Sequence, residues 1–243
     1  MPCSCTPEPL DSHTALKLTP VMPLALGPLV QSIVEGELDS LESFMRRAIG
    51  SFTADADKLT SRLERDAAGL SSEEKDELYE FHSDEWYGLT DTCPRLFLNA
   101  LFVTLVSMAE HQLLNIAAQA EKKHGQAIGK FKKGGNKSTI ASVAGYLRRV
   151  PGLVFPSDHA SWASLETYNR VRNAIVHQYG EAGTGTHADA IAFLAGKNAI
   201  DASTKRIMLT PVICEEALAD VRTFFRELAS GIPGSMAIGA PAV

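Results

Sequence analysis

Apolar residues recur at helical spacing along most of the 243-residue chain. Between residues 29 and 70 they fall three or four positions apart, which predicts one or two helices. A capping box at Ser71 and Glu74 indicates the start of a short helix. Pro94 indicates the first turn of a long helix, about 94–124, that is apolar almost all round. Such a helix is typical of the centre of a bundle.

The second half of the chain continues the helical pattern. A helix over about 138–149 is stopped by Pro151-Gly152, and another begins at residue 157 or 158 and stops at Gly180. A last amphipathic helix opens at Thr210-Pro211.

The segment before that last helix, residues 181–210, is rich in glycine and threonine. Two short candidate strands at 190–194 and 206–209 predict a small hairpin there. The expected fold class is therefore mainly α, an antiparallel helical bundle with a small β-hairpin before the last helix. The expected organisation is an irregular N-terminal arm at 1–26, helices at 27–90 packed on the main domain, a helical domain at 91–231 and a flexible tail at 232–243.

Composition narrows the class of protein without naming a function. Hydrophobic residues make up 45% and charged residues 21% of the chain, which is typical of a soluble globular protein. A net charge of −6 argues against bulk, non-specific binding of nucleic acid, although it leaves room for a local basic patch. The apolar run at 21–34 is too short and too interrupted to cross a bilayer, so we expect a cytoplasmic protein that does not contact a membrane.

The cysteines and histidines do not predict a metal site or a cofactor. Cys3 and Cys5 form a lone C-x-C with no second pair at zinc-ligand spacing, and the histidines do not form an H-x3-H or H-E-x-x-H set. Free, reduced thiols are the expectation. The glycine-rich run near residue 135 also fails as a phosphate-binding loop, because Gly135 stands where the lysine belongs.

The helix that ends at Gly180 carries the most informative polar residues. Measured from Arg172, Asn173 lies about 100° and His177 about 140° around the helix. Arg172 also points almost into the middle of the apolar face, where a cation costs several kcal/mol unless it is paired or at an interface. Glu110, on an apolar row of the long helix, is a second ionisable group at an apparently buried position. We expect it to pair with Arg172; the alternative is an exposed glutamate.

Arg172 to His177 reads R-N-x-x-x-H, and Arg170 forms an overlapping R-x6-H with the same histidine. This pattern resembles the hallmark R-x4–6-H of the HEPN superfamily (higher eukaryotes and prokaryotes nucleotide-binding domains). The order of a long apolar helix with Glu110, a motif helix and a closing helix is also similar, over about residues 91–231. The resemblance implies a helical bundle, a homodimer with two motifs at one cleft, and metal-independent cleavage of RNA. It further implies a role in a toxin–antitoxin or antiphage defence system, with a cognate antitoxin or defence-system partner.

The chemistry of these side chains is consistent with RNA cleavage. An imidazole titrates near neutral pH and suits proton transfer, and a guanidinium offers permanently charged donors to phosphate oxygens. Arg172 and His177 are thus the candidate catalytic residues, with Asn173 positioning and Glu110 and Arg170 supporting. The alternative is structural: a core arginine paired with Glu110 and a histidine favoured by the helix dipole.

A basic stretch follows the long helix and is a weaker candidate for binding RNA phosphates. Its alternative is a solvated loop. The residues concerned are Lys130, Lys132, Lys133 and Lys137.

Two functions of different classes remain open from the sequence. The first is a homodimeric HEPN-type endoribonuclease that needs no cofactor. The second is a non-catalytic HEPN-like module for RNA binding or protein assembly, with Arg172 and His177 at an interface.

Overall fold

A computed structural model describes residues 26–135, 138–177, 180–181 and 188–232. The expected N-terminal arm and C-terminal tail therefore lie outside the described residues, apart from Leu26 and Ile232. Within the described part the fold is mainly α, as the sequence predicts. The elements are α1 (Leu26–Asp66), α2 (Ser72–Phe81), α3 (Ser83–Tyr87), the π-helical turn η1 (Gly88–Thr92), α4 (Cys93–Ile128), α5 (Thr139–Leu147), α6 (Ala160–His177), α7 (Ala188–Gly196) and α8 (Pro211–Ser230).

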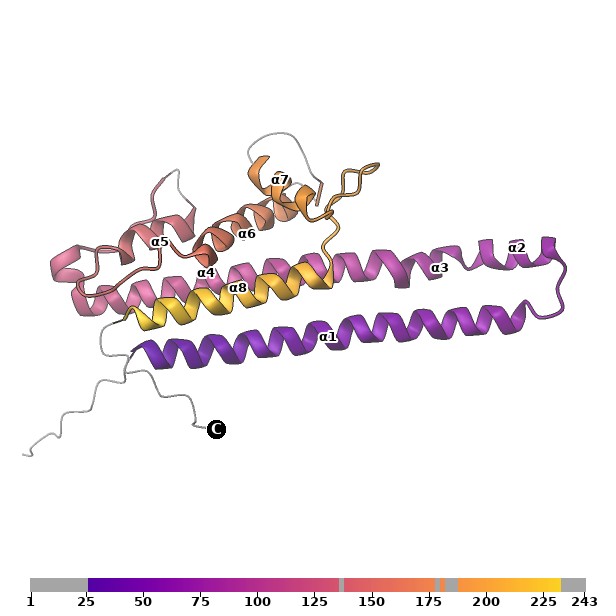
Figure 1. The fold of residues 1–243 in the computed structure, drawn as a ribbon, viewed down its shortest axis with the longest axis horizontal. Helices are drawn as coiled ribbons and strands as arrows, with labels where there is room; N and C mark the ends of the chain where they lie inside the picture. The colour runs from indigo at the N-terminus through magenta and orange to yellow at the C-terminus, as the bar shows by residue number, and fades with distance from the viewer. Residues whose placement is uncertain (1–25, 136–137, 178–179, 182–187, 233–243) are drawn as a thin grey trace, which may run out of the picture.

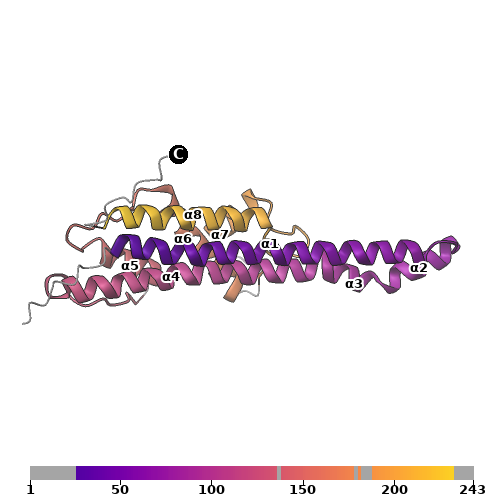
Figure 2. The same ribbon diagram turned by 90° about the horizontal axis from the view of Figure 1, so that it is seen from below.

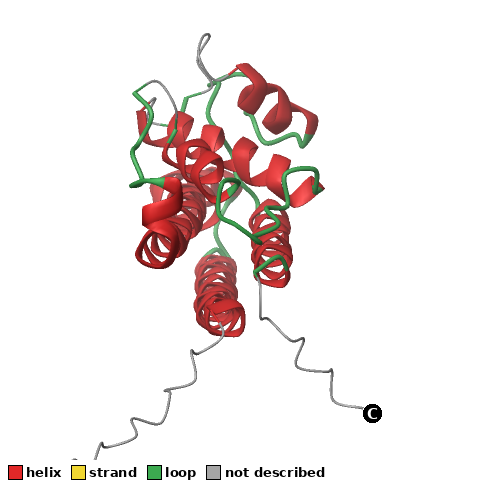
Figure 3. Ribbon diagram, turned by 90° about the vertical axis from the view of Figure 1, so that its left-hand side faces the viewer, coloured by secondary structure: helices red, strands yellow, loops and turns green. Residues whose placement is uncertain are grey.

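The molecule is elongated, with α1 running the whole length of one side (Figure 1). The chain turns back after α1, and α2, α3, η1 and α4 return antiparallel to it (Figure 1). One half of this long pair is covered by α8 beside α1 and by α5 and α6 beside α4, with α7 packed against α6 (Figures 1 and 2). The view along the long axis shows the helices gathered as a bundle (Figure 3), in which α4 packs against α1, α5, α6 and α8. The other half, residues 53–92, projects as a two-helix hairpin that we call the distal arm.

The core lies where α4, α6 and α8 meet. Phe102 and Leu105 of α4, Leu165 of α6 and Phe224 of α8 are all fully buried. This confirms the central place that the apolar composition of α4 predicts. The α4 sequence contains no proline after the first turn and few β-branched residues near its centre. Local helix propensity and burial therefore both favour an α-helix here.

Helix starts follow the predicted signals. Ser71 and Glu74 form the capping box: the Ser71 Oγ accepts a hydrogen bond from the Glu74 backbone N–H, and the Glu74 carboxylate accepts one from the Ser71 N–H. At the start of α8 the Thr210 hydroxyl oxygen accepts a hydrogen bond from the Ile213 backbone N–H at 3.3 Å and so caps the helix. These short-range bonds fix where α2 and α8 begin.

The expected β-hairpin is wrong. Residues 190–194 lie inside α7, where Ala190 and Leu194 are one turn apart and both fully buried. Alanine and leucine are strong helix formers, and this spacing presents one apolar face to the core. Residues 206–209 make only isolated bridges, one of them between Ile200 and Ile207, and none of the described residues forms a β-strand.

One glycine has a clear steric role at the end of α8. The Gly231 carbonyl accepts a hydrogen bond from the Val154 N–H at 2.8 Å. A Cβ on Gly231 would stand only 2.1 Å from the Val154 carbonyl oxygen, so a side chain here forces the two backbones apart. The end of α8 is thereby joined to the loop that precedes α6.

The helical run Ser83–Ile128 is long and apolar enough to cross a membrane by length and composition alone. The central helix of a soluble bundle meets the same criterion, and α4 has many buried residues. The cytoplasmic location expected from the sequence stays a prediction.

Candidate functional site

The motif helix α6 is fixed to the bundle through its apolar face. Trp162, Leu165, Tyr168 and Val171 are buried along it, at helical spacing. The Tyr168 hydroxyl donates a hydrogen bond to a carboxylate oxygen of Asp220 in α8 at 2.6 Å. Burial, and then this bond to a carboxylate, raise the pKa of Tyr168 above its ordinary value. A protonated, anchored tyrosine therefore sets the position of the next helical turn.

That next turn carries Arg172, whose side chain reaches α4. One terminal nitrogen donates to a carboxylate oxygen of Glu110 at 2.6 Å, and the other donates to the Asn173 amide oxygen at 3.0 Å. The side chains of Arg172 and Glu110 are only 21% and 19% exposed. The structure thus brings Arg172 and Glu110 together, as the sequence predicts. Glu110 is mostly buried, so it is not the exposed glutamate of the alternative. Because both side chains are largely shielded from solvent, this charge-assisted hydrogen bond holds the guanidinium in one orientation.

Two buried polar atoms, one on α4 and one on α6, have no hydrogen-bond partner among the described residues. They are the Nε of Arg172 and the amide oxygen of Asn99. Asn99 precedes Glu110 by eleven residues, three helical turns, and so shares its face of α4. The Asn99 amide nitrogen lies 3.6 Å from where a Cβ on Gly180 would stand, which places Asn99 near the end of the motif helix. Asn99 is not among the site residues predicted from the sequence, although its spacing from Glu110 is the available signal.

His177 is the last residue of α6 and is exposed. Ideal helix geometry places it roughly 7 Å further along the axis than Arg172. Its imidazole makes no hydrogen bond with any side chain or backbone group that the structure describes. The residues that follow directly, 178 and 179, lie outside the described part, whereas Gly180 has the positive φ of 76° expected where a helix stops. His177 lies on the same helix as Arg172, and its exposed imidazole is accessible to a ligand.

The two arginines of the overlapping motifs have different surroundings. Arg170 is 45% exposed and pairs with Asp189 of α7 at 2.8 Å, where the Asp189 side chain is 80% exposed. Arg172 is held between α4 and α6. The geometry assigns the half-buried position to Arg172 and a surface contact to Arg170.

The basic stretch is not part of this arrangement. Lys130, Lys132 and Lys133 are exposed in the loop after α4, and Lys137 lies outside the described residues. The first lysine after Glu110, Lys122, is twelve residues further along α4, or about 18 Å at the rise of an α-helix. The lysines and α5 lie toward one end of the bundle, and α7 lies beside the other end of α6 (Figure 1).

One exposed apolar side chain lies close to Arg172 on the motif helix. Val176 follows Arg172 by one turn of α6 and is 47% exposed. The exposed Leu96 of α4 is fourteen residues before Glu110, or about 21 Å along the helix, and is therefore not part of the same surface.

Nothing in the described ranges groups three or more histidine, cysteine or carboxylate side chains in a way that would hold a metal ion. Comparisons with protein-family models, with curated proteins and with solved structures found no match. The likeness to HEPN domains therefore depends on the motif and on the order of the helices.

Proposed function

We propose that this protein is a metal-independent endoribonuclease of HEPN type, which acts as a homodimer with two motif helices facing one cleft. The observation that supports this most is the motif helix itself. It carries a half-buried arginine, held by one carboxylate and one amide, and an exposed histidine five residues later. A cytoplasmic toxin or antiphage role, with a cognate antitoxin or defence-system partner, belongs to the same proposal.

The reaction needs only proton transfer and charge stabilisation. One His177 imidazole accepts the proton of a ribose 2′-OH, and the 2′ oxygen attacks the adjacent phosphorus. The P–O5′ bond breaks, and the His177 of the second copy, in its protonated form, donates a proton to the departing 5′ oxygen. The products are a 2′,3′-cyclic phosphate and a 5′-hydroxyl, so atoms and protons balance without an added reactant.

Arg172 stabilises the negative charge that gathers on the non-bridging oxygens. A guanidinium has five N–H donors, and the contacts to Glu110 and Asn173 use two of them. Glu110 fixes the direction of the group, so that little reorganisation is needed when the phosphate enters. Asn173 is a positioning residue through its bond to Arg172.

The second candidate function is a non-catalytic module for RNA binding or protein assembly. It is favoured by the exposed Val176 next to Arg172, and by the fact that the Arg172–Glu110 pair already joins two helices of one chain. In that case Arg172 contributes to an interface rather than to a reaction.

A cleavage assay on a mixed RNA pool in EDTA tests the proposal. We expect the wild type to cleave and to leave 2′,3′-cyclic phosphate ends. Arg172→Ala and His177→Ala should each lose at least about 100-fold in rate, since each removes a charge or a proton carrier from the transition state. Arg170→Ala is the matched control on the same helix and should stay within about twofold, because its pair with Asp189 is at the surface.

The outcomes separate the two candidates. No cleavage by the wild type, or equal cleavage by all four proteins, contradicts the catalytic assignment. If Arg172→Ala also abolishes dimerisation in analytical ultracentrifugation while the wild type is inactive, the assembly function is supported. A mixture of Arg172→Ala and His177→Ala chains that regains part of the activity would support one cleft built from two copies.

A further inference from the structure

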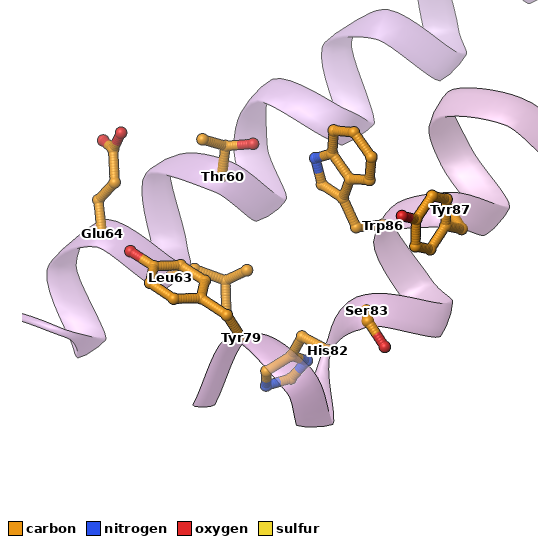
Figure 4. Close-up of a pocket in the computed structure, with 8 residues that line it drawn as sticks. All are labelled: Thr60, Leu63, Glu64, Tyr79, His82, Ser83, Trp86 and Tyr87. Atoms are coloured by element: carbon orange, nitrogen blue, oxygen red, sulfur yellow. The ribbon is translucent and has the colours of Figure 1, made fainter. Parts of the chain in front are cut away.

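The distal arm contains a cavity of about 270 Å³ between the end of α1 and the α2–α3 segment (Figure 4). The rings of Tyr79 and Trp86 flank its open space, with His82 on one side, while Leu63 and Glu64 line it from α1 (Figure 4). Sites for small molecules have volumes of roughly 300–1,000 Å³, so this cavity has the size for one amino-acid side chain.

The aromatic residues around this cavity do not build the core of the arm. No residue of α2, α3 or η1 is buried, and the seam of the arm is formed by Leu59, Leu63 and Ala67 of α1. Tyr79 is 45% and Trp86 42% exposed. Aromatic surface that is left open in this way, at the end of a projecting hairpin, is typical of a contact site for another molecule.

The charge of the arm selects the kind of molecule. Residues 72–92 contain eight aspartates and glutamates and one lysine. Glu64 also lines the cavity, with its carboxylate directed away from the space between the two rings (Figure 4). Phosphates of RNA and anionic lipid surfaces are repelled by such a segment, whereas a cation is attracted both by the carboxylate and by the faces of the rings.

The walls of the cavity are held in place before any partner arrives. One carboxylate oxygen of Glu85 accepts hydrogen bonds from Arg62 at 3.0 Å and from the His82 ring at 3.1 Å, which ties α3 to α1. Lys58, another nearby cation of α1, pairs with Asp55 at 2.9 Å. These two basic side chains of the arm are therefore engaged elsewhere, and a preformed cavity lowers the cost of binding.

We propose that this cavity receives a lysine or arginine side chain from a basic segment of a partner protein. The cation lies between the rings of Tyr79 and Trp86, and Glu64 together with the acidic surface of α2 attracts the rest of the segment. The proposal does not depend on RNA cleavage, and the arm is a different part of the molecule from the motif helix (Figure 1).

Binding of a fluorescein-labelled hexalysine peptide to the full chain at 150 mM salt, followed by anisotropy, tests this. Because a cation–π contact contributes only moderately, we expect Tyr79→Ala to weaken binding about fivefold and Tyr79→Phe to stay within about twofold. Glu64→Gln should weaken it about threefold. The matched controls are Phe81→Ala, an exposed ring that does not line the cavity, and Glu73→Gln, an acid outside it; each should change binding less than its counterpart.

Emission of Trp86 gives a second readout, since the only other tryptophan, Trp162, is buried in the bundle. A peptide that enters the cavity should change this emission in the wild type, and the Tyr79→Ala change should reduce the response. No binding of hexalysine by the wild type overturns the proposal. Equal losses for Glu64→Gln and Glu73→Gln, with none for Tyr79→Ala, would also overturn it, because general attraction between charges would then account for the binding.

Discussion

Two helix interfaces in this bundle each hold a half-buried arginine, and their surroundings differ. Between α1 and α8, Arg222 contacts the carboxylates of Glu35, Asp39 and Glu42. Between α4 and α6, Arg172 contacts one carboxylate, that of Glu110. The two arginine side chains are almost equally exposed, at 18% and 21%, so burial alone does not distinguish them.

The balance of charge does distinguish them. At the α1–α8 interface three cations contact four acids, so every guanidinium there already has a carboxylate partner and one negative charge is in excess. The cations are Arg46, Arg222 and Arg226, and the acids are Glu35, Asp39, Glu42 and Glu215. At the α4–α6 interface one cation faces one acid, and the guanidinium keeps donors that no described residue uses. A phosphate is repelled by the first arrangement and accommodated by the second. The comparison shows why Arg172, rather than Arg222, is the candidate for substrate binding.

The largest expected effect is on stability, at the α1–α8 interface. Arg222→Ala removes the one cation that contacts Glu35, Asp39 and Glu42 together, and leaves Asp39 with no other cation in contact among the described residues. We expect it to lower the free energy of unfolding by about 2–4 kcal/mol, somewhat below the cost of breaking a fully buried pair. Urea unfolding measures this. RNA cleavage per folded molecule should stay at the wild-type level. A loss of cleavage as large as that of Arg172→Ala would contradict the distinction between the two arginines.

Next in size is the loss of the single carboxylate at the α4–α6 interface. Glu110→Ala removes the only acid that contacts Arg172 among the described residues, and we expect a cost of about 1–3 kcal/mol in unfolding free energy. Asp39→Ala is the matched control: its side chain is 68% exposed and Arg222 keeps two other acids, so the cost should stay below about 1 kcal/mol.

A double-mutant cycle sharpens the same point. Glu110→Leu combined with Arg172→Met removes both charges together and should cost less than the sum of the two single changes, by about 1–3 kcal/mol. Strict additivity in urea unfolding would mean that the two side chains do not stabilise each other.

The sequence predicted the α4–α6 pair because both clues are local. Arg172 and Glu110 each stand on an apolar face whose periodicity can be followed along one helix. The α1–α8 cluster could not be found in this way. Glu35, Asp39 and Glu42 repeat at helical spacing on α1, but their shared partner Arg222 lies between 180 and 187 residues later in the chain.

Other differences have the same physical origin. The sequence left one or two helices open for residues 29–70, and the structure forms one, α1, with Gly36 and Gly50 inside it. Glycine in a helix interior lowers the stability of the helix, and the antiparallel packing of α1 against α4 and α8 compensates for that loss. The sequence predicted a strand at 190–194, but a short apolar run does not by itself distinguish a strand from a helix. In the structure, Ala190 and Leu194 are buried on one face of the helix α7. Roles that depend on a second molecule stay predictions.

A smaller effect is expected from the tyrosine that anchors the motif helix to α8. Tyr168→Phe keeps the buried ring and removes the hydrogen bond to Asp220, which should cost about 1–2 kcal/mol in unfolding free energy because the acceptor is charged. If α6 needs this anchor to place Arg172, cleavage should also fall, and Asp220→Asn should reproduce part of the loss. A stability loss with unchanged cleavage would limit Tyr168 to a structural role.

The smallest effect concerns Arg226, the exposed neighbour of Arg222 at the α1–α8 interface. Its Nε donates to Glu35 at 2.6 Å, but the Arg226 side chain is 54% exposed, so water and salt screen the pair. We expect Arg226→Ala to cost about 0.2–1 kcal/mol in urea unfolding at low ionic strength, and less at 1 M salt. The cost of Arg222→Ala should change less with salt, since that side chain is 18% exposed. Equal salt sensitivity of the two variants would mean that the depth of an arginine in this interface does not set its contribution.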